Sequence, residues 1–305
     1  MFQFILRRML WTIPVIFVVS ALTFVLMHSV PGSPFTRERA LPAAIQKNLE
    51  AKYHLNDPLW KQYGDYMWGF IRLDFGPSIA YRARTVNEIL AQQWPVTATL
   101  GAVAFVFAAC LGIPLGILSA VKQNTLIDHS SMVVAMLGVS IPSIALGPFL
   151  IWIFALKLQW LPVATWGTPA HIVLPALTLS TFYLSRFARI TRASMLQVTH
   201  EEYIVTARAK GVRESVVNLK HAFRNAIIPV STIAGPAFAD ILTGSLVVEQ
   251  IFGIPGIGKY YVTSIGNRDY PVIMATTLIF ALLIILMNLL VDISYALLDP
   301  RIRYN

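Results

Sequence analysis

Long apolar stretches recur along this sequence, and each is close to the length that a helix needs to cross a membrane. They cover residues 9–30, 96–121, 130–156, 172–190, 228–250 and 272–297. A spanning helix takes about 20 mostly apolar residues, because each residue rises only about 1.5 Å along the axis. We therefore predict an all-α integral membrane protein with six transmembrane helices.

The shortage of charged side chains agrees with this fold class. Only 13% of the residues are charged and 56% are hydrophobic, whereas soluble domains average about 25% charged residues. The net charge of +9 could indicate a nucleic-acid partner. However, the basic residues flank the apolar stretches, where they set membrane topology, so we expect contact with membrane lipid and no nucleic acid. The single cysteine, Cys110, excludes an intrachain disulfide and a cysteine-based metal site.

The distribution of Lys and Arg predicts which ends of the helices face the cytoplasm, because short cytoplasmic loops carry an excess of both residues. If the N-terminus is cytoplasmic, the same side holds Arg7, Arg8, Lys122, Arg186, Arg189, Arg192, Arg208, Lys210, Arg213, Lys220, Arg224, Arg301 and Arg303. The short loops on the other side hold only Lys157, Lys259 and Arg268. We therefore expect both termini and the 191–227 loop in the cytoplasm.

Three regions follow from this topology. Residues 1–30 hold the N-terminal tail and the first helix. This helix is longer than the apolar core of a signal peptide and lacks a cleavage site, so we expect it to be retained. Residues 31–95 form an extracytoplasmic loop, and residues 96–305 form a core of five transmembrane helices.

The 31–95 loop has helical patterns of its own. Apolar residues recur every four positions between 41 and 53. A second apolar stripe follows Asp57-Pro58, which has the character of an N-cap and a first helical residue. Thr85 and Glu88 have the spacing of a capping box that opens a third short helix. This helical loop either covers the mouth of the bundle or receives a partner.

The polar segment at residues 191–227 separates two apolar stretches and is long enough to form short helices. Its centre combines small residues with a glycine, and the chain returns to apolar sequence at Ile228-Pro229. We predict that residues 206–211 end a short helix and that Gly211 leaves it, because glycine tolerates φ > 0.

Short motifs in a fixed order along the chain carry a family resemblance. They are Phe4-Ile5-Leu6-Arg7-Arg8, Pro31-Gly32-Ser33-Pro34, Lys52-Tyr53-His54-Leu55-Asn56-Asp57-Pro58, Asp74-Phe75-Gly76-Pro77-Ser78, Arg189-Ile190-Thr191-Arg192, Thr206-Ala207-Arg208-Ala209-Lys210-Gly211, Phe252-Gly253-Ile254-Pro255-Gly256-Ile257-Gly258 and Asp299-Pro300-Arg301-Ile302-Arg303. Over almost its whole length the chain resembles the oligopeptide/dipeptide permease family of ABC importers. The resemblance implies the type I importer permease fold and a place in the bacterial cytoplasmic (inner) membrane. It also implies a non-catalytic permease subunit of an ATP-driven peptide importer.

The resemblance further implies the partners. They are a homologous permease subunit that completes a heterodimer, two cytoplasmic ABC ATPase subunits, an extracytoplasmic peptide-binding protein and the peptide substrate. The polar segment would be the coupling loop that enters a cleft of the ATPase, through Thr206, Ala207, Arg208, Ala209, Lys210 and Gly211. The two alanines are small enough to enter such a cleft, and the two cations can meet acidic groups there. Val205 stands where importer loops generally have a Glu, so this chain lacks that acidic group.

We expect no cofactor, metal or catalytic site in this chain. Residues 253–259 have the G-x-x-x-x-G-K spacing of a phosphate-binding loop, but Tyr260 follows where the motif needs Ser or Thr, and Pro255 interrupts it. The segment also lies in a predicted outer loop, which cytoplasmic ATP does not reach. The histidines show no metal-ligand spacing, and no G-x-S-x-G motif occurs. ATP and Mg²⁺ are therefore expected on the partner ATPase subunits.

Asp240 is the most informative polar residue within the apolar stretches. A charge near the middle of a membrane costs about 2.5–3.5 kcal/mol, so it needs a partner or a water-filled path. We predict that Asp240, Thr243 and Ser245 line a substrate path, where the carboxylate could meet a peptide amino group. The alternative is a packing contact with small polar neighbours. Asp292, near the inner end of the last stretch, is expected to pair with a cytoplasmic Arg or Lys.

Two other classes of function remain as alternatives. A self-sufficient secondary transporter or channel would need ionisable groups for ion coupling and often shows an inverted repeat, whereas this chain has few intramembrane charges and no convincing repeat. A membrane enzyme would need a catalytic constellation, and the sequence offers none. ATP-dependent uptake that disappears without separate ATPase subunits would distinguish the three classes.

Overall fold

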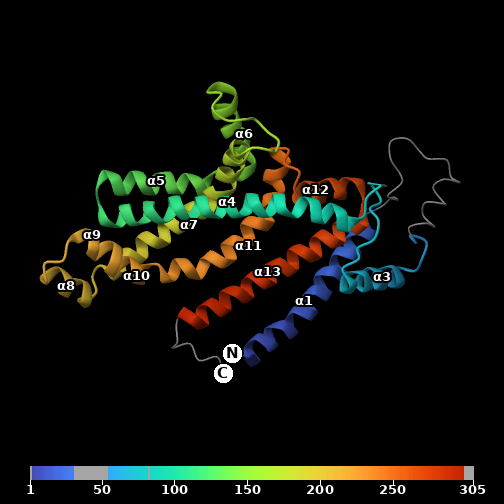
Figure 1. Cartoon of the computed structure of the whole chain (residues 1–305), viewed down its shortest axis with the longest axis horizontal. Helices are drawn as coiled ribbons and strands as arrows, with labels where there is room; N and C mark the ends of the chain where they lie inside the picture. Colours follow the sequence, from blue (N-terminus) through green and yellow to red (C-terminus); the bar gives the residue numbers. More distant parts are fainter. Residues whose placement is uncertain (1, 31–53, 82, 299–305) are drawn as a thin grey trace. The chain divides into compact units, whose positions relative to one another are not determined.

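The structure is a computed structural model that describes residues 2–30, 54–81 and 83–298, with side chains described for residues 7–30, 54–81 and 83–290. Nearly all of this part of the chain is helical (Figure 1). It holds no β-strand, and its β-structure is limited to an isolated bridge between Pro77 and Thr85. The all-α fold class predicted from the sequence is confirmed for these residues.

The described part of the chain is built from α-helices and two π-helical segments. In chain order they are α1 (Phe2–Ser29), α3 (Leu59–Arg72), α4 (Val86–Val121), α5 (Leu126–Ser140), α6 (Ser143–Leu150), the π-helical segment η1 (Ile151–Lys157), α7 (Pro169–Val198), α8 (Glu202–Ala209), α9 (Glu214–Val216), the π-helical segment η2 (Val217–Ala222), α10 (Phe223–Ala226), α11 (Ile228–Ile251), α12 (Ile257–Asn267) and α13 (Tyr270–Leu298). The chain divides into two compact units, which we describe separately. Unit 1 contains Met1–Thr97 and Pro255–Leu289, and unit 2 contains Ala98–Ile254 and Leu290–Ile302.

In unit 1, aromatic side chains of α3 pack on α1 and on the beginning of α13. The buried cluster consists of Phe24, Met27, Tyr270, Ile273 and Met274, and Leu55, Tyr63, Tyr66 and Tyr261 pack against it. Two members of the predicted apolar stripe after Asp57-Pro58 therefore face this core, as the spacing indicated. The stripe predicted between residues 41 and 53 lies outside the described residues.

The start of α3 differs from the prediction by one residue. Pro58 occupies the N-cap position and the helix begins at Leu59. Asp57, predicted as the cap, instead forms an ion pair with Lys61 at 2.8 Å. The hydrogen bond from Lys61 and its positive charge lower the pKa of Asp57.

The predicted capping box is present, but it opens a much longer helix than expected. The N–H of Thr85 donates to Glu88 Oε2 (3.1 Å), and the N–H of Glu88 donates to Thr85 Oγ1 (3.2 Å). The helix that follows is α4, which continues through Pro95 to Val121. The predicted third short helix and the second predicted span are thus one helix, because membrane helices tolerate an internal proline.

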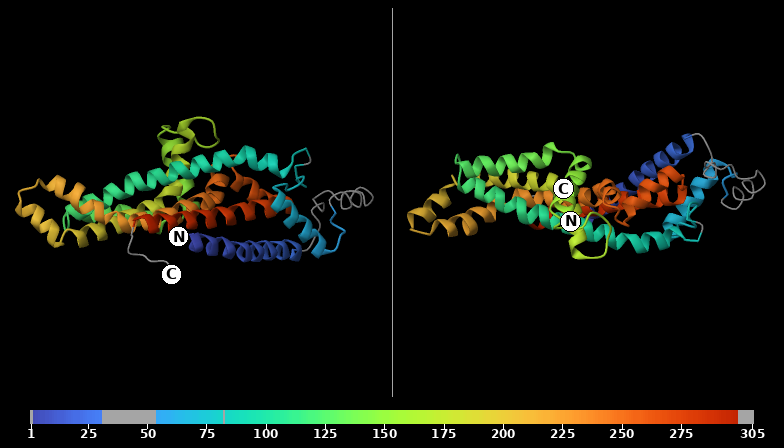
Figure 2. Two further views of the ribbon diagram at one scale, coloured as in Figure 1. Left: turned by 60° about the horizontal axis from the view of Figure 1, so that its bottom comes forward. Right: turned by 90° about the horizontal axis from the view of Figure 1, so that it is seen from above.

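Helix α7 is the centre of unit 2. Helices α5 and α11 run along it (Figures 1 and 2), and glycines bring α4 and α5 close to its backbone. A Cβ at Gly112 or Gly116 would lie 2.5 Å from the carbonyl oxygen of Leu184 or Ala188, respectively. The glycine spacing therefore permits close helix contact, as the small-xxx-small pattern predicts.

Four described helical segments are long and apolar enough to cross a membrane. They are Arg7–Ser29, Val86–Val121, Ile228–Ile251 and Tyr270–Leu290, and each overlaps a predicted span. The third predicted span, residues 130–156, is not one straight helix, because Leu126–Ser140 and Ser143–Lys157 are bent by 110° at the break between them. The fourth, residues 172–190, lies within α7, which is not among the four.

Pro142 explains the bend. The residue before a proline favours extended backbone, and Ile141 has φ −98° and ψ 116°. The N–H groups of Ala145 and Leu146 bond to the carbonyl of Pro142 at 2.9 and 3.0 Å, which starts the next helix. One apolar stretch therefore forms two helices.

The composition of α7 explains why it differs from a simple apolar span. Its hydroxyl residues Thr178, Ser180 and Ser185 lower its hydropathy, and all three are 0% exposed. Because α4, α5 and α11 cover this helix, its side chains contact protein and need not be uniformly apolar.

Candidate functional site

Helix α8 and its exit form the first candidate site. The helix spans Glu202–Ala209, with Lys210 as its C-cap and Gly211 beyond it at φ 73°. The N–H of Gly211 donates to the carbonyl of Arg208 (2.9 Å), and the N–H of Val212 donates to the carbonyl of Ala207 (3.3 Å). This pair of bonds is a Schellman motif, which needs a left-handed residue at the position of Gly211. The predicted local conformation of residues 206–211 is therefore confirmed.

A small apolar core fixes α8 to the rest of unit 2. The core consists of Ala120, Met195, Ile204, Val217, Ala222 and Ala226, each at most 8% exposed. These residues come from α4, α7, α8, η2 and α10. Ala207 packs against this core, whereas Ala209 is exposed. Of the two alanines predicted to enter a partner cleft, only Ala209 therefore lies on the outer face.

The outer face of α8 and η2 carries exposed apolar side chains and an ion pair that is itself exposed to solvent. Val205 is 56% exposed and Leu219 is 59% exposed. Arg208 Nε lies 2.9 Å from Glu214 Oε1, in a pair whose side chains are 39% and 62% exposed. Lys210 is exposed, and Thr206 Oγ1 donates to the carbonyl of Glu202 (2.9 Å). The outer face of α8 and η2 therefore combines exposed apolar side chains with exposed charged ones.

An ion pair that no sequence pattern reveals joins α7 to α5, with the carboxylate buried and the guanidinium half-buried. Arg192 of α7 donates through Nε and Nη2 to the two carboxylate oxygens of Asp128, each at 2.8 Å. Asp128 also accepts from Ser119 Oγ and from the N–H of Asn124. Arg192 is one of the basic residues expected to set the topology, and nothing in the spacing of Arg186, Arg189 and Arg192 distinguishes it.

Asp240 of α11 has a partner on α7. Tyr183 Oη donates to Asp240 Oδ2 at 2.6 Å. Tyr183 is 8% exposed, whereas Asp240 is exposed. Thr243 lies one turn further along α11 and is half-buried, with Oγ1 bonded to the carbonyl of Ala239 (3.1 Å). The structure thus places an oriented carboxylate on an accessible face of α11.

Ser245 does not share that face. It is 0% exposed, and its hydroxyl lies 2.9 Å from Glu249 Oε1. Glu249, a further acid within the predicted stretch 228–250, is also 0% exposed, and no sequence pattern singles it out. The side chain of Asp292 lies outside the described ones.

The glycine-rich segment at residues 253–259 does not have the geometry of a phosphate-binding loop. It follows helix α11, not a strand. The N–H of Ile257, which begins α12, donates to Thr97 Oγ1 at 2.9 Å, and Gly258 beside it is buried. The first N–H group of this helix, which would bind a phosphate, is therefore already bonded to a side chain of the protein. Among the described residues, no cluster of three or more His, Cys, Asp or Glu could hold a metal ion.

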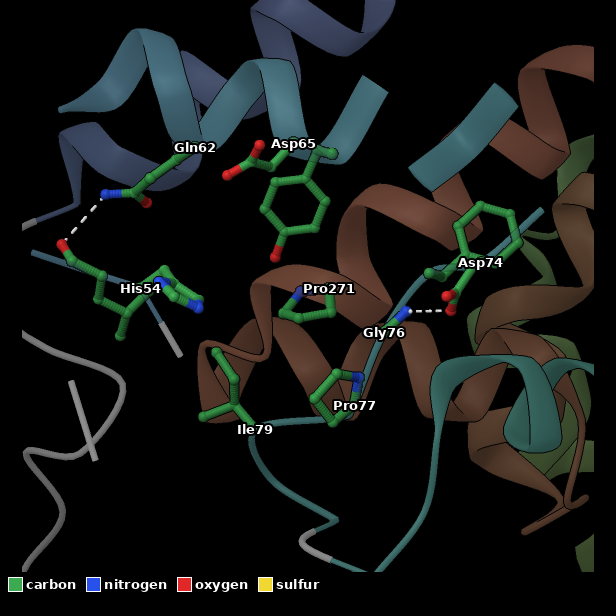
Figure 3. Close-up of a pocket in the computed structure, with 11 residues that line it drawn as sticks. His54, Gln62, Asp65, Asp74, Gly76, Pro77, Ile79 and Pro271 are labelled. Carbon is green, nitrogen blue, oxygen red and sulfur yellow. Dashed lines mark hydrogen bonds between the residues drawn. The ribbon is translucent and has the colours of Figure 1, made fainter. Parts of the chain in front are cut away.

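Unit 1 contains a pocket of about 270 Å³ (Figure 3). In this view Asp65 lies at the top and Asp74 to the right, and the rings of Pro271 and Pro77 lie below them. Burial, and secondarily the charge of Asp269, raises the pKa of the lining residue Tyr66 well above its ordinary value, so its phenol stays neutral.

Asp269 is a further buried polar residue that no sequence pattern singles out. It is 0% exposed and joins the α12–α13 turn to residues 78–80. Its carboxylate accepts from Ser78 Oγ and from the N–H groups of Ile79 and Ala80, the last two at 3.1 Å. The segment between α3 and α4 is thereby fixed within unit 1.

The membrane-length helices and the buried polar groups between them define an integral membrane protein. Residues 112–304 match the family described as binding-protein-dependent transport system inner membrane component, and residues 1–101 match the family of its N-terminal region. The chain belongs to this family of transport-system inner membrane components.

Similar proteins extend over the full length of the chain. The oligopeptide transport system permease protein OppB of Haemophilus influenzae is 46% identical over 306 residues, and that of Salmonella typhimurium is 47% identical, each covering 100% of both chains. The dipeptide transport system permease protein DppB of Bacillus subtilis is 47% identical over 99% of this chain and 98% of its own.

A solved structure has a similar fold. A chain of the MetNI methionine ABC transporter, in an inward-facing conformation, matches 69% of this chain and 96% of its own with a TM-score of 0.58. At 18% sequence identity the match shows the fold alone. It agrees with the ABC importer permease fold that the resemblance implied.

Proposed function

We propose that this chain is a transmembrane permease subunit of an ATP-driven peptide importer. The observation that carries the proposal is its full-length similarity, at 46–47% identity, to permease proteins named for oligopeptide and dipeptide transport. Its geometry supports the same role, because the inner side of α8 is fixed to a buried apolar core while its outer side is exposed and available for a partner. The chain carries out no chemistry in this proposal. It forms half of the path that the peptide takes through the membrane, and it transmits the motion of the ATPase subunits to that path.

The proposed topology has six spans with both termini in the cytoplasm. In addition to the four membrane-length helices, the bent pair of α5 and α6–η1 makes one crossing and α7 makes another. The 191–227 loop is then cytoplasmic and the 31–95 loop is extracytoplasmic. The asymmetry of Lys and Arg between the two sides supports this orientation.

The proposed partners follow from this arrangement. A homologous permease subunit completes the path as a heterodimer, and two cytoplasmic ABC ATPase subunits bind ATP and Mg²⁺. An extracytoplasmic peptide-binding protein delivers the peptide. The ATPase-contacting residues are Thr206, Arg208, Ala209, Lys210 and Gly211, while Ala207 supports them from the inner side of α8.

The proposed substrate path runs along the face of α11 that carries Asp240 and Thr243. Tyr183 occupies one oxygen of Asp240, which leaves the second oxygen and the negative charge for a peptide amino group. Ser245 packs behind this face against Glu249. The alternative, a self-sufficient secondary transporter or channel, would use the same face but would not need the surface of α8.

Reconstitution tests the proposal directly. The chain, its permease partner, the two ATPases and the binding protein are placed in vesicles, and uptake of a labelled tripeptide is measured with and without ATP. We expect uptake that requires ATP, both ATPases and the binding protein. Uptake driven by an ion gradient, with the ATPases absent, would support the alternative and reject the proposal.

A further inference from the structure

The ion pair of Arg192 and Asp128 connects three helices at one end of unit 2. Arg192 belongs to α7 and Asp128 to the first turn of α5. Ser119, near the end of α4, and the N–H of Asn124, in the turn between α4 and α5, donate to the same carboxylate. Both oxygens of Asp128 are therefore satisfied by groups from α4, from the α4–α5 turn and from α7.

This pair differs in kind from the other Arg pair of the same region. The side chain of Asp128 is 2% exposed and receives a two-point guanidinium contact, whereas the Arg208–Glu214 pair has one contact and side chains 39% and 62% exposed. Bidentate Arg–carboxylate pairs fix orientation as well as distance. Ion pairs that are exposed to solvent contribute little to the stability of the fold.

The core beneath α8 shares helices with the ion pair. Ala120 follows Ser119 on α4, and Met195 lies about one turn beyond Arg192 on α7. Both belong to the cluster that holds Ile204 of α8. A force on α8 therefore reaches the ends of α4 and α7 first, and the ion pair fixes those ends to each other and to α5.

We propose that Arg192 and Asp128 are positioning residues for energy coupling. They hold the ends of α4, α5 and α7 as one rigid base, so that a displacement of α8 moves all three helices. Without the ion pair, the ends of α4, α5 and α7 move independently, and a displacement of α8 does not reach the substrate path. This inference rests on the proposed function.

The test uses the assembled complex in vesicles, with Arg192→Gln as the main variant. We expect the ATPases to co-purify and ATP hydrolysis to continue, because the surface of α8 is unchanged. Peptide taken up per ATP hydrolysed should fall about tenfold, within the usual range of coupling between sites. Arg189→Gln is the matched control, since Arg189 is exposed on the same helix and should keep the wild-type ratio.

Arg192→Lys is a second variant for the case in which Arg192→Gln does not fold. It keeps the positive charge beside Asp128 but loses the two-point contact. An intact Arg192→Lys complex with a lowered uptake per ATP supports the inference. A wild-type ratio in Arg192→Lys and Arg192→Gln overturns it, as does loss of the ATPases from both variants, which would indicate a purely structural role. A wild-type complex that lacks ATP-driven uptake would instead overturn the proposed function, and this inference with it.

Discussion

Asp240 is the residue on which the proposed substrate path depends. It is exposed, yet one of its oxygens is held at 2.6 Å by Tyr183, a residue that is itself 8% exposed. The phenol fixes the direction of the carboxylate without neutralising its charge. The packing interpretation of Asp240 explains this hydrogen bond, but it does not explain why the acid is accessible.

Asp240→Asn should therefore lower transport while sparing assembly. The amide keeps the size and can still accept from Tyr183, but it loses the charge that would bind an amino group. A hydrogen bond to a charged group contributes about 1.5–3 kcal/mol, so uptake at limiting peptide should fall by about tenfold or more. Initial uptake rates in vesicles measure this effect. Ser231→Ala, which removes a hydroxyl elsewhere on α11 that bonds only the carbonyl of Ile228, is the control for packing. Unchanged uptake by Asp240→Asn would remove the acid from the path.

At the scale of single elements, the exit of α8 depends on one backbone conformation. Gly211 adopts φ 73°, and nothing lies within 4 Å of where its Cβ would be. A substitution there is thus limited by backbone strain and not by space. A β-branched residue in this region costs on the order of 1–3 kcal/mol, which is enough to open the last turn of a helix as short as α8.

Gly211→Val should weaken the complex with the ATPases. The variant should insert into the membrane normally, because α8 contributes only Ile204 and part of Ala207 to the core. Co-purification of the ATPases and ATP hydrolysis stimulated by peptide and binding protein are the measurements. Gly253→Val carries a comparable strain, at φ 63°, outside this surface, and it should retain the ATPases. If Gly211→Val complexes stay intact and fully stimulated, α8 is not the coupling element.

The elements also show where sequence patterns stop being informative. The lengths of the apolar stretches predicted where the helices lie. They did not predict that the stretch at residues 130–156 forms two helices, because the break comes from the backbone preference of the residue before Pro142. The apolar stretch at residues 172–190 located α7 but not its end at Val198, since the helix continues into the polar sequence that follows. The Arg192–Asp128 pair joins residues 64 positions apart, and no local spacing encodes such a contact.

At the scale of the whole molecule, the topology is the prediction on which the others depend. In a Cys110→Ala background, a cysteine in place of Trp60 should react with a membrane-impermeant maleimide in intact cells, because Trp60 is 76% exposed on α3. A cysteine in place of Lys210 should react only after the membrane is permeabilised. Labelling at position 210 in intact cells would reverse the orientation and contradict the cytoplasmic coupling loop.

The length of α4 has a consequence for how this protein meets the bilayer. Its 36 residues extend about 54 Å along the axis, whereas the hydrocarbon layer is about 30 Å thick. Tilts of membrane helices rarely exceed about 40°, which is too little to immerse such a rod completely. Part of α4 therefore lies outside the hydrocarbon layer. The end that begins at Val86 is that part, since it carries the polar residues Asn87, Glu88, Gln92 and Gln93 before the apolar stretch at residues 96–121 begins.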